Sequence, residues 1–270
     1  MSTWGNPSPM RARSESSRRG RKAEPLSNRM PSVKRPDILA KVYEAAWKKI
    51  EARDIPTTVV QGGQTIFRSI NPGSAYTPLP KPGPGTHVSK VDANKLLIPG
   101  DGVLDLSNRF TGPSHNPGIP PASGLYCVLQ QQALVNESTH YSGKAPFWAL
   151  SGRCVLRMRV MGSILVADLS PHNPSARRFV RELSTGTWDE MNDPKDCSVA
   201  RGIGLACAHS GFLLGMSVQT VRASDRSADE RGDNLVLFAH PGQPVPGLYI
   251  EEVLYFGKTS QPDVFPVAFP

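Results

Sequence analysis

Residues 125–137, LYCVLQQQALVNE, carry the pattern that decides the fold. The apolar run Leu125–Leu129 predicts a buried strand, and residues 130–136 predict the start of a helix directly after it. Because the strand leads into the helix, the side chains of Tyr126 and Glu137 can face one cleft. A carboxylate beside a tyrosine suits acid–base chemistry or the stabilisation of a cation. The alternative is a core tyrosine and an exposed helix glutamate.

The rest of the chain mixes strands and helices without a regular β-α-β alternation, which is typical of the α+β class. A turn at Gly62-Gly63 separates the first two predicted strands. A helix rich in small residues is predicted over 198–214, with Gly211 placed to end it. The other predicted strands lie at Thr57–Val60, Thr65–Arg68, twice within 155–170, at Met216–Val221 and at Asn234–Phe238, and the other helices over 36–53 and 174–183.

The positive charge of the chain is concentrated at its N-terminal end. The 270 residues carry a formal net charge of +8, and residues 1–53, with 13 Lys and Arg against 5 Asp and Glu, hold all of that excess. Residues 1–35 are rich in Ser, Arg and Pro and poor in apolar side chains, so we expect a disordered basic arm. Nucleic acid is therefore expected as a partner only through residues 1–53, and the neutral remainder argues against a nucleic-acid-binding domain.

Composition and motifs disfavour several classes of protein. No apolar run reaches the ~18 residues of a membrane span, and the first residues lack the apolar core of a secretory signal. The sequence contains no Walker A, GxGxxG, HExxH or GxSxG motif. The four cysteines form no CxxC pair and no zinc-type spacing, so we expect reduced, packed thiols, no metal and a cytoplasmic protein. They are Cys127, Cys154, Cys197 and Cys207.

Further positions carry side chains that can bind a ligand. Arg68 lies in the strand-like segment TIFRSI, where it either faces outward or needs an anionic partner. Arg109 directly precedes the aromatic Phe110, and a pair of guanidinium groups suits a diphosphate. Ser224 follows a predicted strand, where it can bind a ligand or cap a turn.

Taken in order, these residues resemble the RES domain family, which is named for its Arg, Glu and Ser. The aromatic–Arg pair that ends the first strand of the family is matched by Phe67-Arg68. The second Arg, also followed by an aromatic residue, is matched by Arg109-Phe110, although the family's usual Gly-Arg-Trp-Asn is altered around it. Tyr126 and Glu137 keep the family's interval of eleven residues between a strand and the helix after it.

The second half of the chain continues the resemblance. The small-residue helix and a strand that ends at Ser224 are present in ARGIGLACAHSGFLLGMSVQTVRAS, and the closing strand is NLVLF, residues 234–238. The resemblance runs from about residue 57 to about residue 255. The expected division of the chain is a basic arm at 1–35, a helical extension at 36–56, a RES-like catalytic domain at 57–258 and a C-terminal tail at 259–270.

The resemblance implies a fold similar to that of ADP-ribosyltransferases: a single α+β domain of mixed or antiparallel sheets with flanking helices and an N-terminal helical extension. It also implies NAD+ as substrate, no metal, and a toxin that cleaves the nicotinamide–ribose bond with water or phosphate. Related proteins transfer ADP-ribose to a protein target instead. Toxin members work in a cytoplasm, in some cases that of a target cell, and an antitoxin or immunity protein holds them inactive.

The resemblance also implies roles for individual residues. Glu137 stabilises the oxocarbenium-like ribose that remains when nicotinamide leaves. Tyr126 stacks on nicotinamide or ribose, and Ser224 forms a hydrogen bond with the ribose or the amide. The two arginines hold the diphosphate. The catalytic group is thus Glu137, Arg68 and Tyr126, and the NAD+-binding group is Arg109, Ser224 and Phe110.

Overall fold

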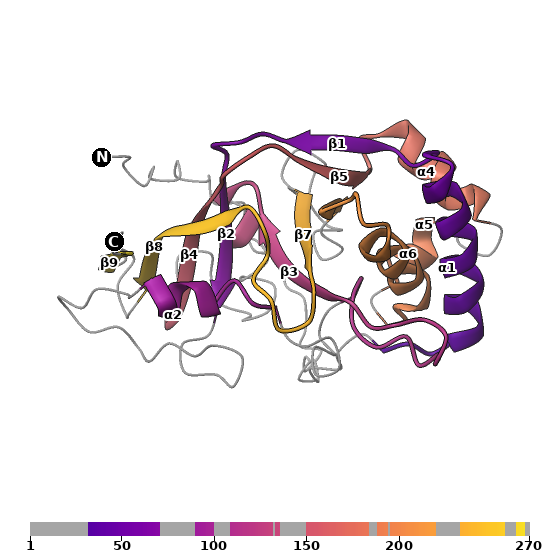
Figure 1. Cartoon of the computed structure of the whole chain (residues 1–270), viewed down its shortest axis with the longest axis horizontal. Coiled ribbons are helices and arrows are strands. Elements are labelled where there is room, and N and C mark those ends of the chain that lie inside the picture. The colour runs from indigo at the N-terminus through magenta and orange to yellow at the C-terminus, as the bar shows by residue number, and fades with distance from the viewer. Residues whose placement is uncertain are drawn as a thin grey trace, which may run out of the picture.

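A computed structural model describes residues 32–70, 90–99, 109–131, 133–135, 150–183, 188–193, 195–219, 233–256 and 263–267. These residues form one mixed β-sheet with helices packed on it, which confirms the predicted α+β class (Figure 1). The helices are α1 (Pro36–Glu51), α2 (Lys90–Lys95), α4 (Pro174–Glu182), α5 (Trp188–Met191) and α6 (Ser198–His209). The strands are β1 (Thr57–Val60), β2 (Thr65–Ile70), β3 (Ser123–Val128), β4 (Arg153–Val160), β5 (Ile164–Leu169), β6 (Gly215–Gln219), β7 (Asp233–Ala239), β8 (Leu248–Phe256) and β9 (Asp263–Pro266).

The described strands lie in the order β1-β5-β6-β7-β3-β2-β4-β8-β9. Neighbouring strands are antiparallel except β5 and β6, which run parallel and are joined through α4, α5 and α6. The segment from β5 to β6 is therefore the crossover connection that a parallel pair requires. It places the helices together on one side of the sheet (Figure 1).

The two strands predicted on either side of Gly62-Gly63 are present, but they do not pair with each other. β1 pairs with β5, and β2 pairs with β4. The bend at Gly62-Gly63 lies against the bend between β4 and β5, since Gly63 N–H donates to Val160 O at 2.7 Å and Gly62 N–H to Ser163 Oγ at 3.3 Å. Gly63 has a φ of +82°, a conformation that suits glycine. The pair β1/β5 and the pair β2/β4 therefore form one two-stranded ribbon that bends here. On one side of the bend lie β1, β5, β6, β7 and β3, and on the other lie β2, β4, β8 and β9; we call these the two halves of the sheet.

These halves meet directly through a single register pair, Phe67 of β2 with Val128 of β3. By contrast, β2 shares six register pairs with β4, and β3 shares six with β7. One of the two large core clusters contains residues from both halves, among them Leu156 and Met158 of β4 and Leu235 of β7. One face of each half therefore contributes to a common interior, and the helices cover the other face of the half that holds β5, β6, β7 and β3.

Helix α1 is part of the packed core. Its buried side chains are spaced three or four residues apart, as the sequence predicted for the helix over 36–53. They are Leu39, Val42, Ala46 and Ile50. At Gly202 of α6, an added Cβ would lie 2.8 Å from Leu39 O, so glycine lets the two helix backbones approach closely. Burial of each large aliphatic side chain contributes about 1.5–3 kcal/mol, which fixes α1 to α6.

Both ends of the described chain differ from the expected arm and tail. Residues 32–35, which close the segment expected to be disordered, contact the residues before α6, and Ser32 bridges to Asp196. Residues 263–266, within the expected tail, form β9 and pair with β8. The helix predicted over 198–214 ends at His209, because Gly211 adopts a left-handed φ of +74°.

Candidate functional site

Three of the predicted site residues lie together beside the helices. The backbone N–H of Arg109 donates to the hydroxyl of Tyr126 at 3.2 Å. The rings of Phe110 and Tyr126 lie with their centroids 6.5 Å apart, tilted by 32°. Arg109 and Phe110 are buried, with 8% and 2% of their surface exposed. Two of the motifs behind the family resemblance are therefore in contact in the fold.

Glycines on both sides let the chain at Arg109-Phe110 fit between β3 and α6. An added Cβ at Gly204 of α6 would lie only 2.0 Å from Phe110 O, and one at Gly124 of β3 would lie 3.0 Å from the side chain of Thr111. Alternation along β3 turns Tyr126 to the same face of the sheet as Gly124. The small-residue pattern of α6, visible in the sequence, thus serves contact with this segment as well as with α1.

The guanidinium of Arg109 is engaged with backbone carbonyls after α5. Its Nη2 donates to Met191 O at 2.9 Å and also to Asp193 O, and its Nε donates to Met191 O at 3.3 Å. Burial lowers the pKa of Arg109, while nearby Tyr126, Cys197 and two carboxylates act in the opposite direction. Sequence reasoning assigned this guanidinium to a diphosphate, but in the structure two of its nitrogens hold the end of α5.

Arg68 lies on the other face of the sheet from Tyr126. Its side chain shares a face of β2 with Ile66 and Ile70, both of which line the interior between the two halves. Burial raises the pKa of Cys127 to about 12, and the charge of Arg68 opposes this rise, so the two side chains are neighbours. Tyr126 instead packs with the cluster under the helices. The structure therefore does not bring Arg68 together with Arg109, Phe110 and Tyr126.

Glu137 and Ser224, the remaining predicted site residues, lie outside the described residues. The helix expected after β3 is described in part, at residue 131 and residues 133–135. The roles of Glu137 and Ser224 therefore stay predictions from the resemblance.

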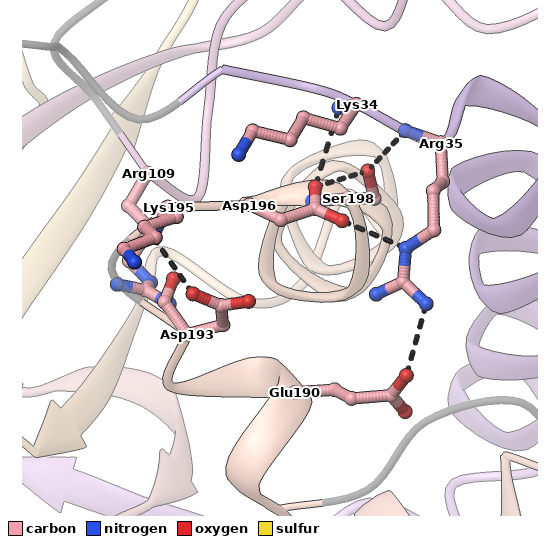
Figure 2. Close-up of polar contacts among 8 residues, drawn as sticks. All are labelled: Lys34, Arg35, Arg109, Glu190, Asp193, Lys195, Asp196 and Ser198. Atoms are coloured by element: carbon pink, nitrogen blue, oxygen red, sulfur yellow. Dashed lines mark hydrogen bonds and ion pairs between the residues drawn. The ribbon is translucent and has the colours of Figure 1, made fainter.

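A cluster of charged residues that sequence reasoning missed lies next to Arg109 (Figure 2). At its centre is Asp196, whose side chain is 7% exposed and whose Oδ2 accepts from Arg35 Nε at 2.7 Å. We call this group of residues the Asp196 cluster. Its members are Lys34, Arg35, Glu190, Asp196 and Ser198. Arg35 and Asp196 are 161 residues apart, so no local pattern could have joined them. The local signal is the sequence Asp-Cys-Ser, residues 196–198, at the start of α6, which is typical of a helix start.

The described cysteines are free and buried, as predicted. Burial raises the pKa of Cys207 to about 12 and that of Cys154 to about 11, so both thiols stay protonated near neutral pH. Within the described ranges, no helix combines the length and hydropathy of a membrane span. In the same ranges, no three His, Cys, Asp or Glu side chains are grouped closely enough to hold a metal ion.

One cavity lies away from these residues, between the end of α1 and α4, with a volume of about 180 Å³. Its charged side chains already have partners: Arg53 lies 3.5 Å over the ring of Phe212, Arg178 contacts Glu182, and Asp54 contacts Lys49. It contains none of the predicted site residues.

No protein-family model matches this sequence, and neither a curated protein nor a solved structure matches it. The resemblance to a family therefore rests on the residues of the chain itself.

Proposed function

We propose that this protein is an NAD+-consuming enzyme of the RES type, with an ADP-ribosyltransferase-like fold, that cleaves the nicotinamide–ribose bond. The observation that carries the proposal is the contact between Arg109-Phe110 and Tyr126. These two motifs are separated along the chain and belong to the ordered set that resembles the family. Their packing in one place is what a shared site requires.

The division of the sheet supports the fold proposed. Two half-sheets that share an interior and meet directly at one register pair agree with a mixed-sheet fold. Arg68 lies on the interior face and Tyr126 on the helix face, so they approach a dinucleotide from different sides of the β2–β3 junction, near Phe67 and Val128. Arg68 is the guanidinium proposed to hold the diphosphate. Arg109 is proposed to hold the backbone that carries Phe110.

The proposed chemistry needs a carboxylate and an oriented substrate. When neutral nicotinamide leaves, the ribose carries positive charge, which Glu137 stabilises while it orients the attacking oxygen. The bond between the ribose carbon and the nicotinamide nitrogen breaks, and the electron pair leaves with nicotinamide. The ring of Tyr126 covers the ribose or the nicotinamide and keeps stray water out. Fixing the dinucleotide in one conformation supplies a further part of the rate enhancement.

Water and phosphate are the acceptors that we place first, and a protein side chain is the alternative. One site serves all three, so the acceptor must be identified by experiment. Nucleic-acid binding through residues 1–53 is less well supported. Residues 36–51 form α1, whose apolar side is buried against α6. The part of residues 1–53 that can bind nucleic acid is correspondingly smaller.

The test is release of nicotinamide from NAD+ by the purified protein, with and without phosphate. We expect release in the wild type and its loss in Glu137→Gln. Glu44→Gln is the matched control, since Glu44 is an exposed glutamate of α1. Acceleration by phosphate identifies a phosphorylase. Equal activity of Glu137→Gln and Glu44→Gln would remove Glu137 from the mechanism.

The absence of nicotinamide release would count against cleavage by water or phosphate, and labelling of proteins with ADP-ribose would then test the transferase. Arg68→Ala provides a second check on the substrate. We expect a large rise in the apparent KM for NAD+ with a smaller change in kcat. An unchanged KM would assign Arg68 to the fold.

A further inference from the structure

The chain just before α1 is bound to the chain between α5 and α6 (Figure 2). Arg35 donates from Nε to Asp196 and from Nη1 to Glu190 Oε1 at 3.0 Å, and its backbone N–H donates to Ser198 Oγ at 2.9 Å. Cys197 N–H donates in turn to Ser32 O at 3.1 Å. Residues 32–35 thus hold both α5, through Glu190, and the start of α6.

Asp196 is saturated with donors. Besides Arg35, its carboxylate accepts from the N–H of Lys34 at 3.2 Å and from the N–H and hydroxyl of Ser198 at 2.9 and 2.5 Å. Burial alone would raise the pKa of Asp196, but these hydrogen bonds outweigh it and hold that pKa at about 2. The carboxylate is therefore ionised at neutral pH, and removal of one partner leaves a buried charge, which is strongly destabilising.

The same stretch of chain is held from its other side by Arg109. Met191 O and Asp193 O accept from the Arg109 guanidinium, and the charge of Asp196 also acts on Arg109. The backbone N–H of Arg109 in turn donates to Tyr126. A continuous set of described contacts therefore connects Arg35, through Asp196 and the α5–α6 segment, to Arg109 and Tyr126.

We propose that Arg35 and Asp196 are positioning residues: they fix the α5–α6 segment so that Arg109 holds Phe110 and Tyr126 in the candidate site. Neither side chain touches the substrate in this assignment. Its structural part, the coupling of the Asp196 cluster to Arg109, stands on the contacts alone. Its catalytic part rests on the proposed function.

The chain offers a matched control at the other end of α1. Lys49, like Arg35, is a basic residue that pairs with two carboxylates, Asp54 at 3.0 Å and Glu182 at 2.7 Å. Lys49 lies in the last turn of α1, away from the Asp196 cluster. Lys49→Ala removes two ion pairs at one end of α1, as Arg35→Ala removes two just before the other end, so it separates a general loss of stability from an effect on the site.

The first experiment is hydrogen exchange of the full chain in Arg35→Ala, Asp196→Asn and Lys49→Ala. We expect both substitutions in the Asp196 cluster to speed exchange about tenfold at residues 188–198 and also at 109–112, with the interior of α6 unchanged. Lys49→Ala should leave 109–112 as in the wild type. Faster exchange at 188–198 with an unchanged 109–112 would overturn the coupling, as would an equal effect of Lys49→Ala.

The second experiment compares two truncations, which remove residues 1–31 and 1–35. The shorter truncation retains Ser32 to Arg35, and the longer one removes them. We expect kcat for nicotinamide release to be unchanged in the first and to fall about tenfold in the second, with Arg35→Lys restoring part of the kcat lost in Arg35→Ala. Equal kcat in both truncations would overturn the positioning role.

The two experiments separate this inference from the proposed function. A wild type that releases no nicotinamide, but in which the Asp196 cluster still controls exchange at 109–112, would contradict the activity and support the coupling. A wild type that releases nicotinamide at a rate that Arg35→Ala and Lys49→Ala lower equally would support the activity and overturn the positioning role.

Discussion

The hydroxyl of Tyr126 links β3 to the backbone of Arg109, whose N–H donates to it at an N···O distance of 3.2 Å. A part-buried donor left without its acceptor costs about 1–3 kcal/mol. We therefore expect Tyr126→Phe to lower the free energy of unfolding by about 1–2 kcal/mol, because the ring stays in place but the hydrogen bond is lost. Denaturation by urea measures this change in the free energy of unfolding. The same change at Tyr255, a half-buried residue of β8, should cost less, and equal losses would contradict the role of this hydroxyl.

The carboxyl group of Asp196 makes the stability depend on pH in the acid range. Its pKa is held at about 2 in the folded protein, below the ordinary value of 3.8, so the unfolded chain binds a proton first as the pH falls. Its contribution is complete above about pH 5, where the unfolded chain is also ionised, and is lost as the pH falls toward 2. The difference between the two pKa values corresponds to about 2 kcal/mol.

Comparison of the wild type with Asp196→Asn across this range isolates the contribution of Asp196. We expect the difference in the free energy of unfolding between them to shrink steadily from about pH 5 to about pH 2, since Asp196 in the wild type becomes neutral. A difference that stays constant over that range would mean that Asp196 does not titrate with folding.

At the scale of the element, α6 fits only because two of its residues have no side chain. An added Cβ at Gly204 would lie 2.0 Å from Phe110 O, whereas Gly162, in the bend after β4, has no atom within 4 Å of an added Cβ. Alanine normally stabilises a helix relative to glycine by about 1 kcal/mol. We nevertheless expect Gly204→Ala to destabilise the protein by about 2–3 kcal/mol, because the backbone of Phe110 must move.

Thermal unfolding of Gly204→Ala beside Gly162→Ala measures this effect, and the control should change little. Gly202→Ala is a second comparison, since its Cβ would meet Leu39 of α1 rather than Phe110. Both helix variants should lose stability, and Gly204→Ala should alter nicotinamide release more strongly, because its Cβ meets Phe110 itself. A Gly204→Ala protein as stable as the wild type would contradict the close packing at Phe110.

Many of the elements could be predicted from the sequence, but β8, β9, α2 and α5 were missed, and the pairing of the strands could not be predicted at all. Local periodicity located α1 and the strands β1 and β2, because the buried side chains of one element repeat along the chain. The turn at Gly62-Gly63 suggested neighbouring strands, yet β1 and β2 pair with residues about a hundred positions later in the chain. Pairing over that distance depends on the packing of the whole sheet, so a local sequence pattern does not predict it.

The candidate site divides in the same way. The motifs of Arg109-Phe110 and Tyr126 could be recognised from the sequence, and the fold brings them together. The role of Arg109 could not be inferred, because the carbonyls that it binds belong to a segment more than eighty residues away. No local pattern linked Arg35 to Asp196 for the same reason: an ion pair between residues 161 positions apart is formed by the fold alone.

At the scale of the whole molecule, charge and fold are separated along the chain. Residues 54–270 carry equal numbers of basic and acidic side chains, and the excess of positive charge lies in residues 1–53. Of that excess, residues 1–31 hold 7 Lys and Arg against 2 Asp and Glu. The charge of Arg35 is instead neutralised within the fold, because Arg35 pairs with Glu190 and Asp196.

Binding to a polyanion should therefore depend on residues 1–31 and not on the folded body. We expect the full chain to bind heparin with a strong dependence on salt, because each neutralised anionic group releases a counterion. Removal of residues 1–31 should lower the salt concentration at which the protein elutes from a heparin column while nicotinamide release stays unchanged. An unchanged elution would place the polyanion-binding surface on the body, and a loss of nicotinamide release would place residues 1–31 in the active structure.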